Sequence, residues 1–106
     1  MEICHYVTLA GVDAFQEWLD GLRDVNGRIA IQRRVDRLLR DNYGDHKFCR
    51  DGVWELRIDF GPGYRVYYAQ AEKTVVLLLC GGSKRNQSRD ITEAVRYWID
   101  YQRRES

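Results

Sequence analysis

Charged side chains that could act on a phosphate group alternate with apolar ones along residues 53–60, and one more lies within residues 64–71. Strict alternation is the period of a half-buried strand, so Glu55 and Arg57 share the polar face of the first segment and Arg65 lies on that of the second. Two guanidinium groups could stabilise the charge that builds on a phosphorane, while a carboxylate accepts the proton of an attacking ribose 2′-hydroxyl. The pattern predicts a site for RNA cleavage, with a solvated strand face as the simpler alternative.

The turn between the two segments decides whether these charges meet. Gly-Pro-Gly at residues 61–63 predicts a three-residue loop, which pairs Phe60 with Tyr64 and places Asp59 opposite Arg65 as a surface ion pair. A loop of two or four residues would exchange the two faces of the second segment relative to the first, and would turn Tyr64 toward the polar side. We therefore expect an open sheet face that carries Glu55, Arg57, Asp59, Arg65 and Tyr67.

Further residues could contact nucleic acid near this face. Lys84 follows Gly-Gly-Ser, so a flexible turn could bring its ammonium group to a phosphate, although the other residues of a Walker A loop are missing and an ordinary exposed lysine fits equally. Tyr97 and Tyr101 lie four residues apart on the last predicted helix, where they could stack on a base or pack at the sheet rim. The remaining candidate contacts are Lys47 and Tyr67.

A cluster of arginines lies on a different predicted element. Five of them surround the outside of a helix expected at residues 28–40, which is more than solubility requires. They could follow a phosphate backbone, or they could form the surface that an acidic partner covers. The five residues are Arg28, Arg33, Arg34, Arg37 and Arg40.

Hydrophobic spacing predicts the elements that position these side chains. Asp13 should cap a first helix, and the arginine-rich segment should form a helical hairpin with it. The order predicts an α+β fold, with an antiparallel or mixed sheet, an N-terminal αα-hairpin on one face and a C-terminal helix. Strands are expected at residues 3–8, 45–48, 53–60, 64–71 and 74–80, the last of them apolar on both faces and central in the sheet, and the final helix is expected at residues 86–103.

Length and composition bound the class of protein. The chain has 106 residues, 44% of them hydrophobic, so we expect one domain over residues 1–106. It shows neither a basic leader nor a long apolar run, which predicts a cytoplasmic protein without membrane contacts. Its three cysteines and two histidines lack metal-ligand spacing, so we expect free thiols with Cys80 buried, no metal and no cofactor.

Three segments of the chain carry a resemblance to a known family: GVWELRIDFGPGYRVYYA, TVVLLLCGGSKRNQSRDITEA and YWIDY. They resemble the phage-derived addiction-module killer proteins of the RelE/ParE superfamily, close to HigB-type toxins. The resemblance implies a sheet backed by a helical hairpin, and cleavage of mRNA in the ribosomal decoding site. It also implies inhibition by a helix-turn-helix antitoxin of the HigA (XRE-like) type, with operator DNA bound only through the complex of the two proteins.

The resemblance also transfers roles to single residues. The basic residues that act in such toxins map onto Arg57, Arg65 and Lys84, with Lys47 and Tyr101 as weaker transfers. The additional lysines, or the histidine with an acidic partner, that relatives place around the phosphate have no clear match here. Geometry favours Glu55 as the general base, with His46 or Lys84 as alternatives.

A second function on the same fold stays open at this point. ParE-type relatives are non-catalytic inhibitors of DNA gyrase that use helices rather than the sheet, and one scaffold can host both functions. Replacement of Arg57 or Arg65 by alanine should abolish toxicity in the ribonuclease and spare it in the gyrase inhibitor.

Overall fold

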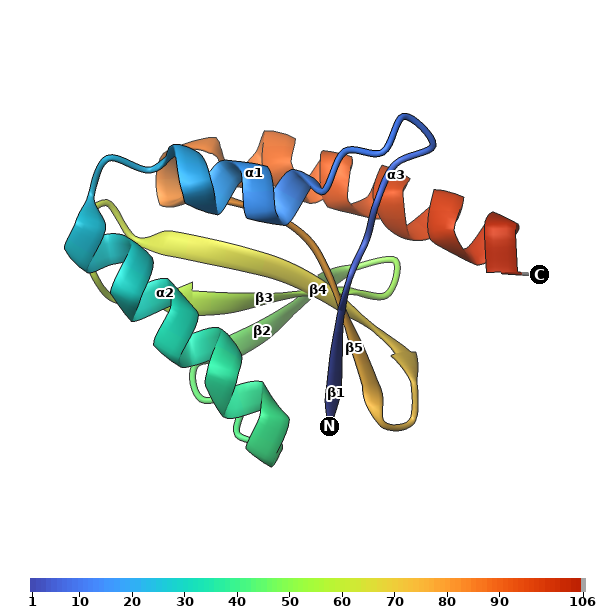
Figure 1. Ribbon diagram of the computed structural model, residues 1–106, viewed down its shortest axis with the longest axis horizontal. Coiled ribbons are helices and arrows are strands. Elements are labelled where there is room, and N and C mark those ends of the chain that lie inside the picture. Colours follow the sequence, from blue (N-terminus) through green and yellow to red (C-terminus); the bar gives the residue numbers. More distant parts are fainter. Residues whose placement is uncertain (106) are drawn as a thin grey trace.

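The computed structural model describes residues 1–105, in which five strands form one mixed sheet in the order β1-β5-β4-β3-β2 (Figure 1). β1 runs parallel to β5, and the other neighbours are antiparallel. This confirms the expected α+β fold. The elements are β1 (Glu2–His5), α1 (Ala14–Gly21), α2 (Val25–Arg37), η1 (Leu38–Arg40), β2 (His46–Arg50), β3 (Val53–Ile58), β4 (Tyr64–Glu72), β5 (Val75–Ser83), η2 (Lys84–Asn86) and α3 (Gln87–Glu105).

Both faces of the sheet are covered, so the protein has two hydrophobic cores. The α1–α2 hairpin packs on one face, where Phe15 and Ile31 meet Val66 and Leu78. α3 packs on the other face, where its buried residues meet Tyr67 and the remaining apolar side chains of β5. β5 is apolar on both faces and lies inside the sheet, between β1 and β4, as its sequence predicts.

The turn between β3 and β4 is longer than the sequence predicts. Ile58 pairs with Tyr64, so residues 59–63 form a five-residue connection, and the expected pairing of Phe60 with Tyr64 is wrong. Gly61 and Gly63 adopt positive φ angles of 56° and 78°, which lets the chain reverse outside the ladder. The register moves by two residues, so the parity is preserved and the same side chains share a face.

Two consequences of this longer turn correct the sequence-based predictions. Asp59 lies outside the ladder and is exposed, so it is not the cross-strand partner of Arg65. Arg65 faces Arg57 instead. Phe60, expected on the core side, is 38% exposed.

α2 begins three residues earlier than its hydrophobic pattern predicts. The Asp24 side chain accepts a hydrogen bond from the backbone N–H of Gly27 at 2.9 Å and caps the helix, so Asn26 and Gly27 lie in its first turn. A Cβ atom on Gly27 would lie 2.7 Å from the Tyr64 ring, so only glycine fits there. Ile31, Val35 and Leu38 are buried, whereas Ile29 and Leu39 are exposed.

The remaining expectations concern thiols and membranes. Cys4, Cys49 and Cys80 are free, and Cys80 is buried, as predicted. Within residues 1–105, the structure contains no helix that is long and apolar enough to cross a bilayer.

Candidate functional site

A buried carboxylate joins two arginines on the face of the sheet that α3 covers. Glu55 is 1% exposed, and its Oε2 atom lies 3.1 Å from Nε of Arg65 and its Oε1 atom 3.8 Å from Nε of Arg57. The side-chain amide of Gln87 donates to both carboxylate oxygens, at 3.0 Å each. Because a buried charge is costly unless it is paired and hydrogen-bonded, these three partners make the position of Glu55 possible.

Strand register positions the two arginines. Arg57 on β3 faces Arg65 on β4, and Arg65 in turn faces Gly82 on β5. Gly82 leaves space that Asp90 fills from the first turns of α3, since a Cβ atom on Gly82 would lie 1.9 Å from a carboxylate oxygen of Asp90. Burial raises the pKa of the Asp90 carboxyl group, and the neighbouring Arg89 opposes this shift. This row of cross-strand positions, Arg57, Arg65 and Gly82, therefore places two guanidinium groups side by side beneath the start of α3.

Lys84 lies at the end of this row, next to the β3–β4 turn. Its backbone N–H donates to the carbonyl oxygen of Gly63 at 2.8 Å, and one terminal nitrogen of Arg65 donates to the same oxygen at 3.2 Å. A Cβ atom on Gly63 would lie 3.4 Å from both the Arg65 guanidinium and Cβ of Lys84. Gly63 thus lies between Arg65 and Lys84, and the exposed Lys84 borders the arginine pair.

The face that carries these residues is not open, which corrects a central sequence-based prediction. Tyr67 is 0% exposed, because α3 and β5 cover it, and burial raises the pKa of its phenol. Its hydroxyl oxygen has no hydrogen-bond partner within the described part of the chain. The sequence carries one signal of this cover, because a strand that is apolar on both faces, as β5 is, is buried on both sides of the sheet.

The two residues expected on the weak strand lie on opposite faces of the sheet. Lys47 is exposed and faces Glu55 across the β2–β3 ladder, so it lies on the face of the arginine pair. His46 faces Leu56 and packs beside Tyr43 and Trp54, on the face that the helical hairpin covers. His46 therefore cannot reach the Glu55 cluster, and its assignment as an alternative base is wrong.

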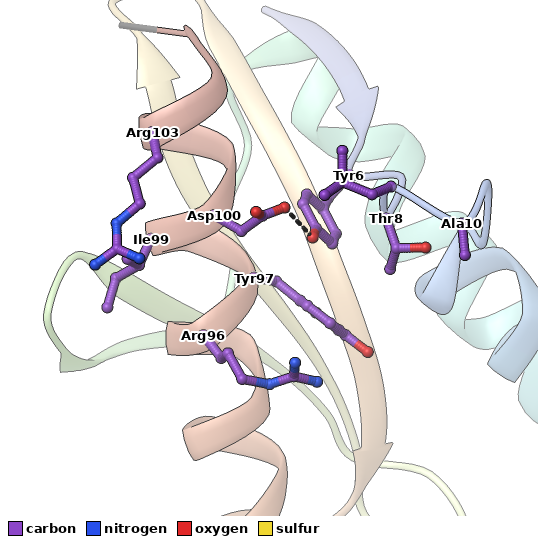
Figure 2. A pocket seen from close by; sticks show the side chains of 9 residues that line it. Tyr6, Thr8, Ala10, Arg96, Tyr97, Ile99, Asp100 and Arg103 are labelled. Carbon is purple, nitrogen blue, oxygen red and sulfur yellow. Dashed lines mark hydrogen bonds between the residues drawn. The ribbon is translucent and has the colours of Figure 1, made fainter.

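The tyrosines of α3 lie far from the arginine pair. Tyr97 follows Gln87 by ten residues, which corresponds to roughly 15 Å along the helix axis, and Tyr101 lies one further turn away. Tyr97 stacks on Tyr6, with ring centroids 4.8 Å apart (Figure 2), and Tyr101 stacks on Trp98. Burial and Glu93 raise the pKa of Tyr97 to about 12. The structure does not bring these two residues to the candidate site.

The cluster has an excess of positive charge. Three cations, Arg57, Arg65 and Lys84, lie along these strand ends with two carboxylates, those of Glu55 and Asp90. The Arg57 side chain is 33% exposed and that of Arg65 is 11% exposed, so one guanidinium reaches solvent while the other is largely desolvated. Such an arrangement can bind a phosphate and stabilise additional negative charge on it. Within residues 1–105, the structure has no group of three or more His, Cys, Asp or Glu residues that could hold a metal ion.

Comparison with known proteins places the chain in a family. Residues 18–96 match the model of the phage-derived protein Gp49-like family (DUF891). A protein of Haemophilus influenzae, described only as uncharacterized, is 45% identical over 80 residues, which cover 76% of this chain and 81% of that protein. The chain is a member of the Gp49-like family. Gp49-like proteins are RelE/ParE-like toxins of toxin–antitoxin systems.

The extent of the Gp49-like match divides the candidate residues. Residues 18–96 include the whole Glu55 cluster, with Gln87 and Lys84, whereas Tyr97 and Tyr101 lie beyond its end. The cluster therefore lies within the part of the chain that the family model matches.

Two members of the candidate site could not be found by strand parity. Gln87 and Asp90 come from the start of α3, and both project onto the polar row of the sheet. Their sequence signal is weak, but it exists. They are three residues apart, which is the spacing of one helix face, and they directly follow the strand that carries two adjacent glycines.

Proposed function

We propose that this protein is the toxin of a type II toxin–antitoxin pair and that it inhibits translation by cleaving mRNA on the ribosome, as HigB-type endoribonucleases do. Membership of the Gp49-like family supports the first part. One observation carries the second part, namely the cross-strand pair of Arg57 and Arg65 held by the buried carboxylate of Glu55.

The proposed reaction begins with a phosphodiester of the mRNA at the exposed edge of the cluster. Arg57 and Lys84 meet the phosphate, while the more buried Arg65 stabilises the charge that develops on the phosphorane, because its guanidinium is already largely removed from water. The ribose 2′-oxygen forms the new bond to phosphorus and the bond to the 5′-oxygen breaks. The products are a 2′,3′-cyclic phosphate and a 5′-hydroxyl end.

The proton transfers involve the remaining groups of the cluster. Glu55 accepts hydrogen bonds from Gln87 at both carboxylate oxygens, so in the resting protein it holds the arginines in place. It accepts the proton of the 2′-hydroxyl once the substrate displaces the Gln87 amide. The ammonium of Lys84 protonates the leaving 5′-oxygen.

The family implies an antitoxin partner. We propose a helix-turn-helix antitoxin of the HigA type, encoded beside the toxin, and we propose that operator DNA is bound only through the complex of the two proteins. The ribosome presents the mRNA.

The test is induction of the protein in cells, with and without the adjacent reading frame, followed by mapping of RNA 5′ ends. Ends should accumulate within translated frames and fall by about 100-fold for Arg57→Ala, as expected for the loss of a group that stabilises transition-state charge. Arg57 suits this test because its side chain is partly exposed, so its removal disturbs the buried cluster less than removal of Arg65 would.

Arg23→Ala is the matched control, because Arg23 is an exposed arginine outside the cluster. It should leave the cleavage pattern unchanged, and thermal melting should show that both variants are folded. Growth arrest with intact mRNA, together with inhibition of DNA supercoiling that survives Arg57→Ala, would instead identify a non-catalytic gyrase inhibitor of the ParE type.

A further inference from the structure

A pocket of about 580 Å³ lies between the β1–α1 connection and the C-terminal half of α3 (Figure 2). Leu9, on the connection, is 82% exposed, and Ile99, on α3, is 40% exposed. Both line the pocket, together with Ala10. A concave surface with exposed apolar residues on two of its walls is typical of a site for a protein partner.

The aromatic rings of this pocket are already engaged on their faces. The rings of Tyr6 and Tyr97 stack, and the guanidinium carbon of Arg96 lies 5.2 Å from the centroid of Tyr97, on the side away from Tyr6 in Figure 2. Arg104 lies over the ring of Tyr6 at 5.3 Å. Since a nucleic-acid base would need a free ring face for stacking, these contacts favour protein side chains as the occupant.

Charges on α3 frame the apolar part of the pocket. Asp100 also lines it, but this carboxylate accepts a hydrogen bond from the Tyr6 hydroxyl at 2.6 Å and pairs with Arg104 at 3.0 Å. Arg96 and Arg103 are seven residues apart, which places them two turns and roughly 10 Å apart on one side of the helix, and Ile99 lies between them. Arg96 bonds to Glu93 through two nitrogens, but a guanidinium has five N–H donors and can accept a second carboxylate. The complementary surface is an apolar side chain with carboxylates placed to reach Arg96 and Arg103.

We propose that this pocket docks an amphipathic, acidic helix of the cognate antitoxin. An apolar side chain of that helix inserts between Leu9 and Ile99, and its carboxylates bind Arg96 and Arg103. The identity of the partner rests on the proposed toxin function, whereas the chemistry of the docking segment follows from the pocket.

This docking would inhibit the toxin without touching the arginine pair. The start of α3 holds Gln87 on Glu55, and its C-terminal half forms one wall of the pocket. A partner that contacts both the β1–α1 connection and α3 therefore holds α3 against the sheet. The reactivity of the Cys80 thiol measures this restraint, because the thiol is buried beneath α3, in one cluster with Ala94 and Val95.

The first experiment measures the affinity of the purified toxin for the product of the adjacent reading frame. Leu9→Asp should weaken binding by about tenfold, and the double change Arg96→Glu with Arg103→Glu by about 100-fold. The matched controls lie on the arginine-rich outer surface of α2 and η1, where Arg33 and Arg40 are also seven residues apart and Leu39 is 54% exposed. Leu39→Asp, and Arg33→Glu with Arg40→Glu, should change affinity by less than about threefold.

Losses confined to the α2 and η1 variants, or no binding by the unaltered protein, would overturn the docking site.

The second experiment follows the reaction of Cys80 with a thiol reagent in a Cys4→Ser, Cys49→Ser background. Bound partner should slow this reaction at least about tenfold; an unchanged or faster reaction would show that the partner does not hold α3 against the sheet. mRNA cleavage is measured separately, and Leu9→Asp is expected to cleave normally. Failure of the docking proposal can therefore be distinguished from failure of the ribonuclease proposal.

Discussion

The side-chain amide of Gln87 donates to both carboxylate oxygens of Glu55, at 3.0 Å each, and this pair of hydrogen bonds connects α3 to the arginine pair of the sheet. A carboxylate buried in this way has no water to stabilise it, so its free energy depends on the amide and on two guanidinium groups.

Replacement of Glu55 should be strongly destabilising, because it leaves two guanidinium groups without their carboxylate partner. We expect Glu55→Ala to lower the free energy of unfolding by about 3 kcal/mol, measured by urea denaturation. Glu72→Ala, at an exposed position on the same sheet, should change it by less than about 0.5 kcal/mol. Equal effects of the two substitutions would show that the Glu55 cluster does not stabilise the fold.

Gln87→Glu should make stability depend on pH. The new carboxylate would face that of Glu55, and two like charges at hydrogen-bond distance raise the pKa of the introduced carboxyl group above its unfolded-state value. Stability is then retained below the unfolded-state value and lost as pH rises through the folded-state value. Thermal melts from pH 4 to pH 8 should show a steeper fall in Tm for Gln87→Glu than for the unaltered protein, in which only Asp90, among residues 1–105, contributes such a fall. Parallel curves for the two proteins would argue against the contact.

Asp90→Asn should stabilise the protein at neutral pH. Burial raises the pKa of Asp90 in the folded state, so the charged carboxylate is disfavoured there, and stability falls as pH rises through this value. The neutral amide avoids this loss. We expect a gain of less than about 1 kcal/mol at pH 7 that disappears in acid, where Asp90 is protonated. A gain that persists unchanged at low pH would point to a cause other than the charge.

Gly81→Ala should test the packing of α1 on β5. A Cβ atom on Gly81 would lie 2.2 Å from the indole ring of Trp18, a rigid neighbour, so we expect a loss of about 2 kcal/mol. Gly21→Ala is the control, because Gly21 ends α1 with nothing within 4 Å of the added atom, and alanine favours a helix by up to about 1 kcal/mol. Opposite signs for the two glycines are the expected result, measured by denaturant unfolding.

The sequence predicts which residues share a face, but it does not predict what covers that face. Alternation in β3 and β4 depends only on parity, so Glu55, Arg57 and Arg65 stay together although the turn is two residues longer than expected. The length of the turn depends on the positive φ angles of Gly61 and Gly63, which sequence spacing does not specify. Cover depends on which amphipathic helix packs on which side of the sheet.

The same distinction explains the misplaced residues. His46 and Lys47 are adjacent, so one must lie on each face of β2, and only the observed register assigns Lys47 to the face of Glu55. Tyr67 alternates with core residues and is expected at the surface, yet α3 supplies a second core that buries it. The contact of Gln87 is not predicted from the sequence, because its partner, Glu55, lies 32 residues away.

The most direct test of the central proposal is single-turnover cleavage of mRNA on purified, programmed ribosomes. The unaltered protein should cut the mRNA to leave a 5′-hydroxyl end, and Arg65→Lys, which keeps the charge but loses the planar fork, should cut at least about tenfold more slowly. An mRNA with 2′-deoxyribose at the cleaved nucleotide should not be cut, because the attacking hydroxyl is missing. Cleavage of the deoxy substrate would contradict the proposed site. Full activity of both single variants, Arg65→Lys and Arg57→Ala, would contradict it as well.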